Sequence, residues 1–276
     1  TNVNEKINEL FFCDRVKLRK NFHTIFTSAT LTNLVSEDLT KAYSYFIQNT
    51  MFPINDSILS EVKYSPFAYD KHAKLFYTDD ITSPSKDRGK FIDESIDLVK
   101  KILDISQGKA LILFTSKTDM NAVYIRLKAL NLNYTLIKQN EISSQQQLIH
   151  KFKQDINSVL LGTGVFWEGI SIEGIALSNL IIYKLPFPLP EPIINEKCKR
   201  SKNPLEEVLV PEMIIKLKQG VGRLIRNKTD KGIVSIIDSR LGDKSKASYK
   251  EKVWQALPIK QRTNSLKELQ SFYDNL

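Results

Sequence analysis

Short apolar runs alternate with amphipathic helical patterns through much of this sequence. Residues 110–114 read ALILF, five apolar residues in succession, which is typical of a parallel strand buried on both faces. Before this run, residues 91–105 predict a helix with one apolar stripe, formed by Ile92, Ile96, Val99 and Leu103. Strands separated by helical patterns indicate βαβ units, so the sequence predicts an α/β fold with helices on both faces of a parallel sheet.

The alternation continues on both sides of these two elements. Further strands are expected at residues 75–80, 134–138, 159–161, 180–183 and 233–237, the last of which we expect to be the final strand. Further helices are expected at residues 38–52, 120–130, 146–152 and 249–257, followed by a polar tail. The two acids that end residues 75–80, LFYTDD, could suggest a magnesium site. The sequence holds no G-x-x-x-x-G-K-[ST] phosphate loop, so an ordinary strand end is expected there.

Composition and charge limit the class of protein. The chain has 276 residues, is 42% hydrophobic and carries a net charge of +9, which favours a polyanionic partner such as nucleic acid over a merely basic surface. No apolar run reaches the roughly 18 residues that a membrane span needs, so we expect a cytoplasmic protein without membrane contact. Cys13 and Cys198 lie far apart without a C-x-x-C pair, so neither a disulfide framework nor a zinc or iron-sulfur site is expected.

Residues 213–227, MIIKLKQGVGRLIRN, hold a coherent set of polar residues. If the whole segment is helical, Gln219, Arg223 and Arg226 fall within about 60° of one another on one face. The opposite face is apolar and comprises Ile214, Leu217, Val221, Leu224 and Ile225. Gly220 and Gly222 each cost about 1 kcal/mol in a helix relative to alanine, so close approach of a ligand or another backbone is expected to offset that loss.

The exposed residues of this helix suit phosphate recognition, because guanidinium groups stay charged and donate hydrogen bonds in a planar fork. A solvated basic face is the alternative. QGVGRLIRN resembles motif VI of superfamily 2 helicases in the form found in the DinG and XPD family, Q-x-x-G-R-x-x-R. The resemblance implies that Arg223 and Arg226 are catalytic arginine fingers, which reach the γ-phosphate of an ATP whose phosphate loop sits in another domain. It also implies that Gln219 and Gly222 belong to the nucleotide site.

Residues 161–174, LGTGVFWEGISIEG, form a second signature. Its glycines free the backbone to approach a ligand, and a dinucleotide G-x-G-x-x-G is disfavoured because the third glycine is displaced. The segment is similar to motif V of the DinG branch. That similarity implies nucleic-acid contacts from Thr163, Phe166 and Trp167, and places Glu168 and Gly169 near the nucleotide. Ser171 stands where the family has aspartate, which favours weaker coupling to ATP.

Two shorter segments resemble further helicase motifs. Thr115, Ser116 and Lys117 follow the strand at residues 110–114, as in motif IV, which implies contacts to a nucleic-acid phosphate. Capping of the next helix by Ser116 is the alternative. Residues 23–30, HTIFTSAT, predict a short strand and resemble motif III, in which Ser28 and Thr30 would couple the nucleotide to nucleic acid. A helix N-cap at Thr30 or Thr32 is the alternative there.

Two segments near motif VI also match the family. Residues 184–192, KLPFPLPEP, must be extended surface chain because prolines remove strand hydrogen bonds. The lysines and arginine of residues 197–202 suggest a basic loop that could follow a DNA strand, with a plain solvated loop as the alternative. Asp238 and Arg240 resemble the D-x-R that follows motif VI.

The resemblance implies that the chain contains parts of two domains and that these domains have different functions. Residues 1–32 would end a first RecA-like domain, and residues 33–276 would form the second. ATP and Mg²⁺ would be bound mainly by the first domain, which would be joined in cis, and single-stranded DNA would be the partner. This chain alone is therefore expected to be inactive, and any iron-sulfur cluster is expected outside it. Two alternatives stay open: a DNA-binding or nucleotide-regulated module of a DinG-type 3'-5' exonuclease, and a nucleic-acid-binding scaffold.

Overall fold

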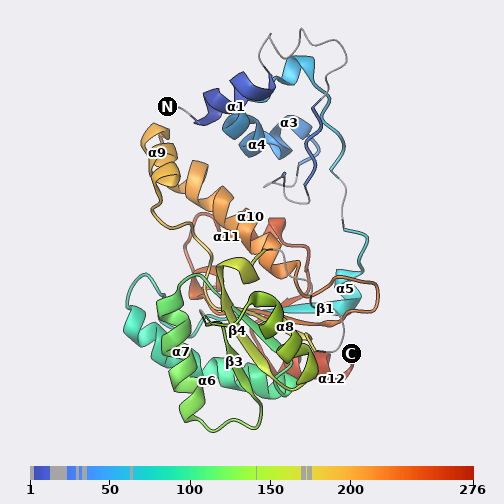
Figure 1. Ribbon diagram of the computed structural model, residues 1–276, viewed down its shortest axis with the longest axis vertical. Helices are drawn as coiled ribbons and strands as arrows, with labels where there is room; N and C mark the ends of the chain where they lie inside the picture. The colour runs from blue at the N-terminus through green and yellow to red at the C-terminus, as the bar shows by residue number, and fades with distance from the viewer. Residues whose placement is uncertain are drawn as a thin grey trace.

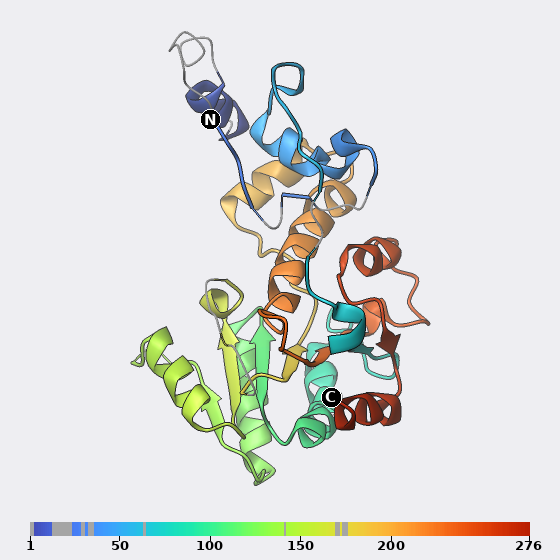
Figure 2. The same cartoon turned by 90° about the vertical axis from the view of Figure 1, so that its right-hand side faces the viewer.

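A computed structural model describes residues 3–12, 24–28, 31–32, 36–62, 65–140, 142–168, 172 and 176–276. The described chain has two parts, a sheet domain and a smaller helical unit above it (Figure 1). The long helix α10, Val210–Val221, runs from the helical unit down to the sheet (Figure 2).

The sheet has seven strands, all parallel, in the order β3-β4-β2-β5-β6-β1-β7. The strands are β1 Ala73–Tyr77, β2 Ala110–Phe114, β3 Leu136–Lys138, β4 Val159–Thr163, β5 Asn179–Ile182, β6 Gly232–Ile236 and β7 Arg262–Thr263. Four of them, β2, β4, β5 and β6, are buried at every position on both faces, so apolar runs without alternation identified them correctly. The predicted parallel α/β fold is confirmed.

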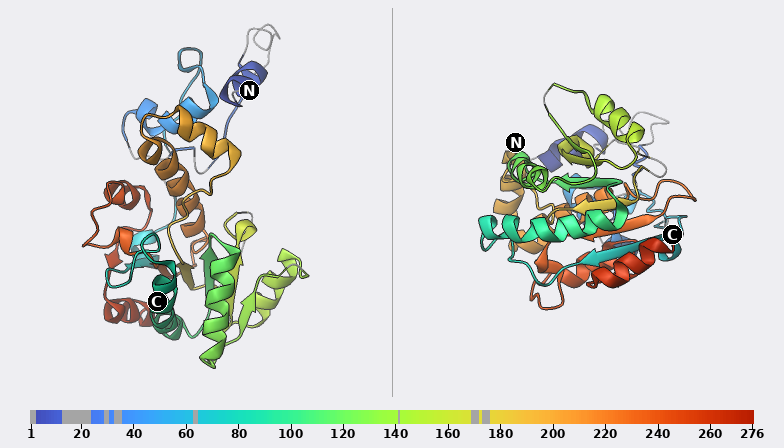
Figure 3. Two further views of the ribbon diagram at one scale, coloured as in Figure 1. Left: turned by 90° about the vertical axis from the view of Figure 1, so that its left-hand side faces the viewer. Right: turned by 90° about the horizontal axis from the view of Figure 1, so that it is seen from below.

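Helices cover both faces of the sheet (Figure 3). One face packs on α6 Arg88–Ser106, α7 Lys117–Ala129 and α12 Leu266–Asp274. The other packs on α8 Gln145–Gln154, α10 and α11 Lys250–Ala256. Successive residues of β2 alternate between the two cores, with Leu111 and Leu113 in one and Ile112 and Phe114 in the other.

The end of the chain differs from the prediction. The polar tail expected after α11 is wrong, and β6 is not the final strand, because β7 pairs with β1 and is followed by α12. Leu269 on α12 is fully buried against the sheet. β7 has only two residues, too few for a recognisable pattern of hydrophobicity.

The helical unit is formed by residues from the first part of the chain and by helices inserted between β5 and β6. It contains α1 Val3–Phe11, α3 Leu39–Ala42, α4 Ser44–Thr50 and the short 3₁₀-helix η1 Ile54–Asp56. The inserted helices are α9 Pro192–Arg200 and the π-helix η3 Leu205–Leu209. The basic loop expected at residues 197–202 is therefore wrong for Lys197, Lys199 and Arg200, which lie on α9.

An aromatic cluster holds the first part of this unit together. Phe26 contacts Phe12, Phe46 and Phe52, with ring centroids 5.8, 5.4 and 6.2 Å apart. Residues 24–28 form no strand, so the strand expected at residues 23–30 is wrong for the described part. The apolar character of that segment instead serves packing against α4.

Polar contacts fasten the helical unit to α10. Glu212 lies in the first turn of α10. Its carboxylate accepts a hydrogen bond from the Tyr45 hydroxyl and forms an ion pair with Lys197 at 2.8 Å. Further along the helix, the Lys218 ammonium donates to the Thr32 carbonyl at 2.9 Å. The helix that leads to the predicted arginines is thus held at both ends by the first part of the chain.

Candidate functional site

α10 ends before the two arginines. Its last residue is Val221, and Gly222 caps it through a bond from its N–H to the Lys218 carbonyl at 2.9 Å. The prediction that Arg223 and Arg226 share a helical face with Gln219 is therefore wrong, because only Gln219 is on the helix. The apolar side was predicted correctly, since Ile214, Leu217, Val221, Leu224 and Ile225 are all buried.

An aromatic ring explains why a glycine stands at position 220. A Cβ at this position would lie 2.7 Å from Cζ3 of Trp167 and 2.9 Å from its Cε3, closer than such atoms can approach. The expected close approach is therefore real, although a side chain makes it and not a ligand or a backbone. The Lys216 ammonium, one turn earlier on α10, lies 5.7 Å from the centre of the Trp167 ring.

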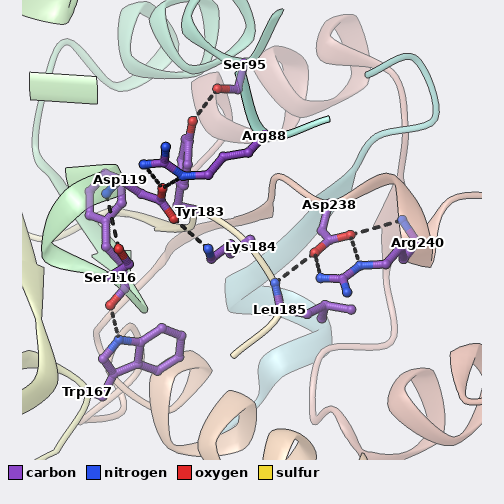
Figure 4. A network of polar contacts seen from close by, with 11 residues as sticks. Arg88, Ser95, Ser116, Asp119, Trp167, Tyr183, Lys184, Leu185, Asp238 and Arg240 are labelled. Atoms are coloured by element: carbon purple, nitrogen blue, oxygen red, sulfur yellow. Dashed lines mark hydrogen bonds and ion pairs between the residues drawn. The ribbon is translucent and has the colours of Figure 1, made fainter. Parts of the chain in front are cut away.

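Phe166 and Trp167 are fully buried, so the nucleic-acid contacts expected from their side chains are wrong for this structure. The loop after β4 begins with the 3₁₀-helix η2, Gly164–Phe166, which turns both rings inward. The Phe166 ring occupies the space beside Gly162, where a Cβ would lie 2.5 Å from it. The Trp167 Nε1 donates to the Phe114 carbonyl at 2.8 Å, which satisfies its buried N–H (Figure 4).

Arg223 is bound to the same loop. Its Nε donates to the Trp167 carbonyl at 3.0 Å. Burial lowers the pKa of Arg223, the charge of Arg226 lowers it further, and the exposed Glu168 carboxylate opposes both effects. Arg226 and Glu168 therefore both lie within electrostatic range of Arg223.

Arg226 lies in the turn between α10 and β6. Its N–H and that of Asn227 donate to one oxygen of Asp230, at 2.8 and 3.0 Å, which fixes the backbone of the turn. The Arg226 charge also opposes the rise that burial causes in the pKa of Tyr69, a residue of the short helix α5, Tyr69–His72. Both arginines are half-buried.

The structure describes only some of the other residues that were predicted for the nucleotide site. Gln219 is half-buried in the last turn of α10, and Gly222 is its C-cap. Gly169 and Ser171 lie outside the described residues, as does Thr30. Ser28 is exposed, two residues after Phe26.

The motif IV residues lie where β2 meets α7. Ser116 is the N-cap of α7 and accepts a hydrogen bond from the Asp119 N–H at 3.3 Å, so the capping alternative is confirmed. Thr115 is half-buried and Lys117 is exposed in the first turn of α7.

Thr163 of motif V lies at the end of β4 and is buried. Both its N–H and its hydroxyl donate to Oε1 of Gln139, at 2.7 and 3.1 Å.

The structure adds a buried carboxylate that the sequence did not single out. Asp119 accepts hydrogen bonds from Arg88 Nε at 2.7 Å and from Lys184 Nζ at 2.5 Å (Figure 4). Asp119 is 2% exposed, and its partners come from α6 and from the segment after β5. Their separation along the chain gives no local pattern that could have revealed the cluster.

A second buried carboxylate involves the predicted D-x-R pair. Asp238 is fully buried, and its two oxygens accept bonds from Arg240 Nε at 2.9 Å and from Arg240 Nη2 at 2.6 Å. The same carboxylate accepts from the Leu185 N–H at 2.9 Å (Figure 4). The Arg240 guanidinium also lies over the Phe187 ring, at 5.1 Å. The proline-rich segment is thus anchored to the end of β6, where the 3₁₀-helix η4, Ser239–Leu241, begins.

An all-parallel sheet in this order, covered on both faces, defines the chain as a RecA-like α/β domain, the class expected from the sequence. A family model described as "Helicase C-terminal domain" matches residues 99–260, more than half of the chain. The protein belongs to that family.

Curated relatives support the same assignment. The chain is 33% identical over 258 residues to "ATP-dependent DNA helicase YoaA" of Haemophilus influenzae, covering 91% of this chain and 38% of that protein. It is 32% identical to "3'-5' exonuclease DinG" of Bacillus subtilis, covering 93% of this chain and 27% of that protein. The chain therefore spans little more than a third of these relatives at most.

Solved structures agree at the level of the fold. A structure titled "XPD_Helicase" superposes with a TM-score of 0.54 at 23% identity, covering 67% of this chain and 34% of that one. "XPD_APO" superposes with a TM-score of 0.53 at 21% identity, covering 70% of this chain and 39% of that one.

The described residues hold neither a membrane-spanning helix nor a cluster of metal ligands. No helix in these ranges is long and apolar enough to cross a membrane. Within the same residues, no group of three or more His, Cys, Asp or Glu side chains is arranged to hold a metal ion.

Proposed function

We propose that this chain is the second motor domain of an ATP-dependent DNA helicase, to which it supplies Arg223 and Arg226 as arginine fingers. Guanidinium groups at this position would stabilise charge on the transferred phosphoryl group, while the phosphate loop and Mg²⁺ are supplied by a first domain. One observation carries the proposal: the Trp167 carbonyl of motif V holds Nε of Arg223 beside Glu168 and Arg226. This contact supports the proposal because it links motif V directly to an arginine of motif VI.

A DNA track fits the neighbouring carboxyl ends of the parallel strands β2 and β4. Lys117 and the start of α7 follow β2, and helix N-termini favour phosphate groups. Since Phe166 and Trp167 are buried, this part of the track would bind the DNA backbone and would not stack on bases. The domain would then contribute to single-stranded DNA binding that weakens as salt is added.

The isolated chain is expected to hydrolyse no ATP and to bind it weakly, because arginine fingers act in the transition state while the phosphate loop lies elsewhere. Hydrolysis is followed by phosphate release and binding by titration with a fluorescent ATP analogue. Circular dichroism confirms that the chain is folded. Turnover that persists after further purification would refute the division of labour between two domains.

A second function has support from one relative. The 32% identity to the Bacillus subtilis "3'-5' exonuclease DinG" extends over 93% of this chain, so the domain is equally compatible with a regulatory module of a nuclease. Full-length protein with Mg²⁺ and a 3'-labelled duplex DNA that carries single-stranded tails separates the two functions. Digestion without ATP supports the nuclease, whereas ATP-dependent strand separation without digestion supports the motor.

A further inference from the structure

Three helicase motifs meet at the Trp167 side chain. Its Nε1 is bound to the Phe114 carbonyl at the end of β2, directly before Thr115 of motif IV. Its six-membered ring fills the space beside Gly220 on α10, the helix that ends at motif VI. Trp167 itself belongs to motif V, so one buried side chain contacts the other two motifs.

The backbone of the same residue contacts a predicted arginine finger. The Trp167 carbonyl accepts the hydrogen bond from Nε of Arg223. A carbonyl in a loop can rotate with its peptide plane, whereas the Trp167 peptide is restrained by a fully buried indole with a satisfied N–H. The position of the indole therefore fixes the direction in which the carbonyl points.

From these contacts we infer that Trp167 is a positioning residue for Arg223. The inference rests on the proposed function. The indole sets the distance between the motif V loop and α10, and the carbonyl orients the guanidinium towards the phosphate site. A displacement of the indole would misplace Arg223 without removing it, and a misplacement of about 1 Å can cost about 10²-fold in rate.

The test uses the full-length protein and the DNA-stimulated rate of ATP hydrolysis. Trp167→Phe removes the Nε1 donor and part of the ring, and we expect it to lower kcat about 10-fold to 100-fold with little change in the KM for ATP. Trp254→Phe is the matched control, because Trp254 is also buried but packs on Tyr77, 5.5 Å away, on another part of the sheet domain. The control is expected to leave kcat unchanged.

A double-mutant cycle separates positioning from general support of the fold. In an Arg223→Ala background, Trp167→Phe is expected to cause less than about a twofold further loss, because there is no guanidinium left to orient. Equal losses in both backgrounds would overturn the inference while leaving the role of Arg223 intact. An Arg223→Ala variant with full activity would overturn the proposed function and the inference with it.

A second variant keeps the test valid if Trp167→Phe unfolds the protein. Gly220→Ala places a methyl group 2.7 Å from the indole and should displace it while retaining every polar group. The same loss of kcat, again absent in the Arg223→Ala background, is expected. A Gly220→Ala variant that folds and keeps full activity would contradict the inference.

Discussion

Replacing Arg226 with alanine in the full-length protein is expected to lower the rate of DNA-stimulated ATP hydrolysis about 10³-fold, the lower end of the range for arginine fingers. The half-buried guanidinium lies in a turn that Asp230 fixes through backbone N–H groups. Because those bonds do not involve the side chain, they survive the substitution. The loss should therefore appear in kcat, measured by phosphate release at saturating ATP and DNA.

Arg126→Ala is the matched control for this experiment. Arg126 is also an arginine, but it lies on α7 and pairs on the surface with Asp93 at 2.8 Å. Its removal should leave kcat unchanged, which shows that loss of a positive charge is not sufficient. An unchanged rate for Arg226→Ala would exclude that residue as an arginine finger.

Replacing Asp238 with alanine is expected to cause the largest loss of stability, about 3–5 kcal/mol, because it leaves a mostly buried charge without its partner. The Asp238 side chain is fully buried and that of Arg240 is 21% exposed. The substitution also removes the acceptor of the Leu185 N–H, which is buried. Urea unfolding followed by tryptophan fluorescence measures the difference.

The comparison variant is Asp80→Ala. Asp80 also pairs with a cation, Lys244 at 3.0 Å, but its side chain is 85% exposed. Solvent screens such a pair, so the midpoint of unfolding should not move measurably. Equal stability losses for the two variants would show that burial does not determine the strength of the Asp238 contact.

The central strands β2, β4, β5 and β6 were predictable because they consist mainly of apolar residues that the sheet buries on both faces. The ALILF run predicted β2 with its correct bounds, because a run of this length between helical patterns is typical of a strand buried on both faces. Motif V and motif VI were also recognisable, because their residue types and spacing are local. In these cases the information lies within about ten residues of sequence.

The errors arose where distant residues decide the local structure. Nothing near Gly220 shows that an indole 53 residues earlier will fill its side-chain space, so the sequence predicts close approach of a ligand or a backbone there and a helix that continues through Arg226. Phe166 and Trp167 were expected at the surface for the same reason. Asp119 likewise binds partners 31 and 65 residues away, which no local pattern encodes.

The most direct test of the arginine fingers compares binding of a transition-state mimic with binding of the ground state. Full-length protein should bind ADP with aluminium fluoride more tightly than ADP alone, since the guanidiniums would act on charge that develops in the transition state. Arg223→Ala and Arg226→Ala should lose most of this preference but still bind ADP, whereas Arg126→Ala should retain it. Arginine variants that keep the full preference would contradict the account.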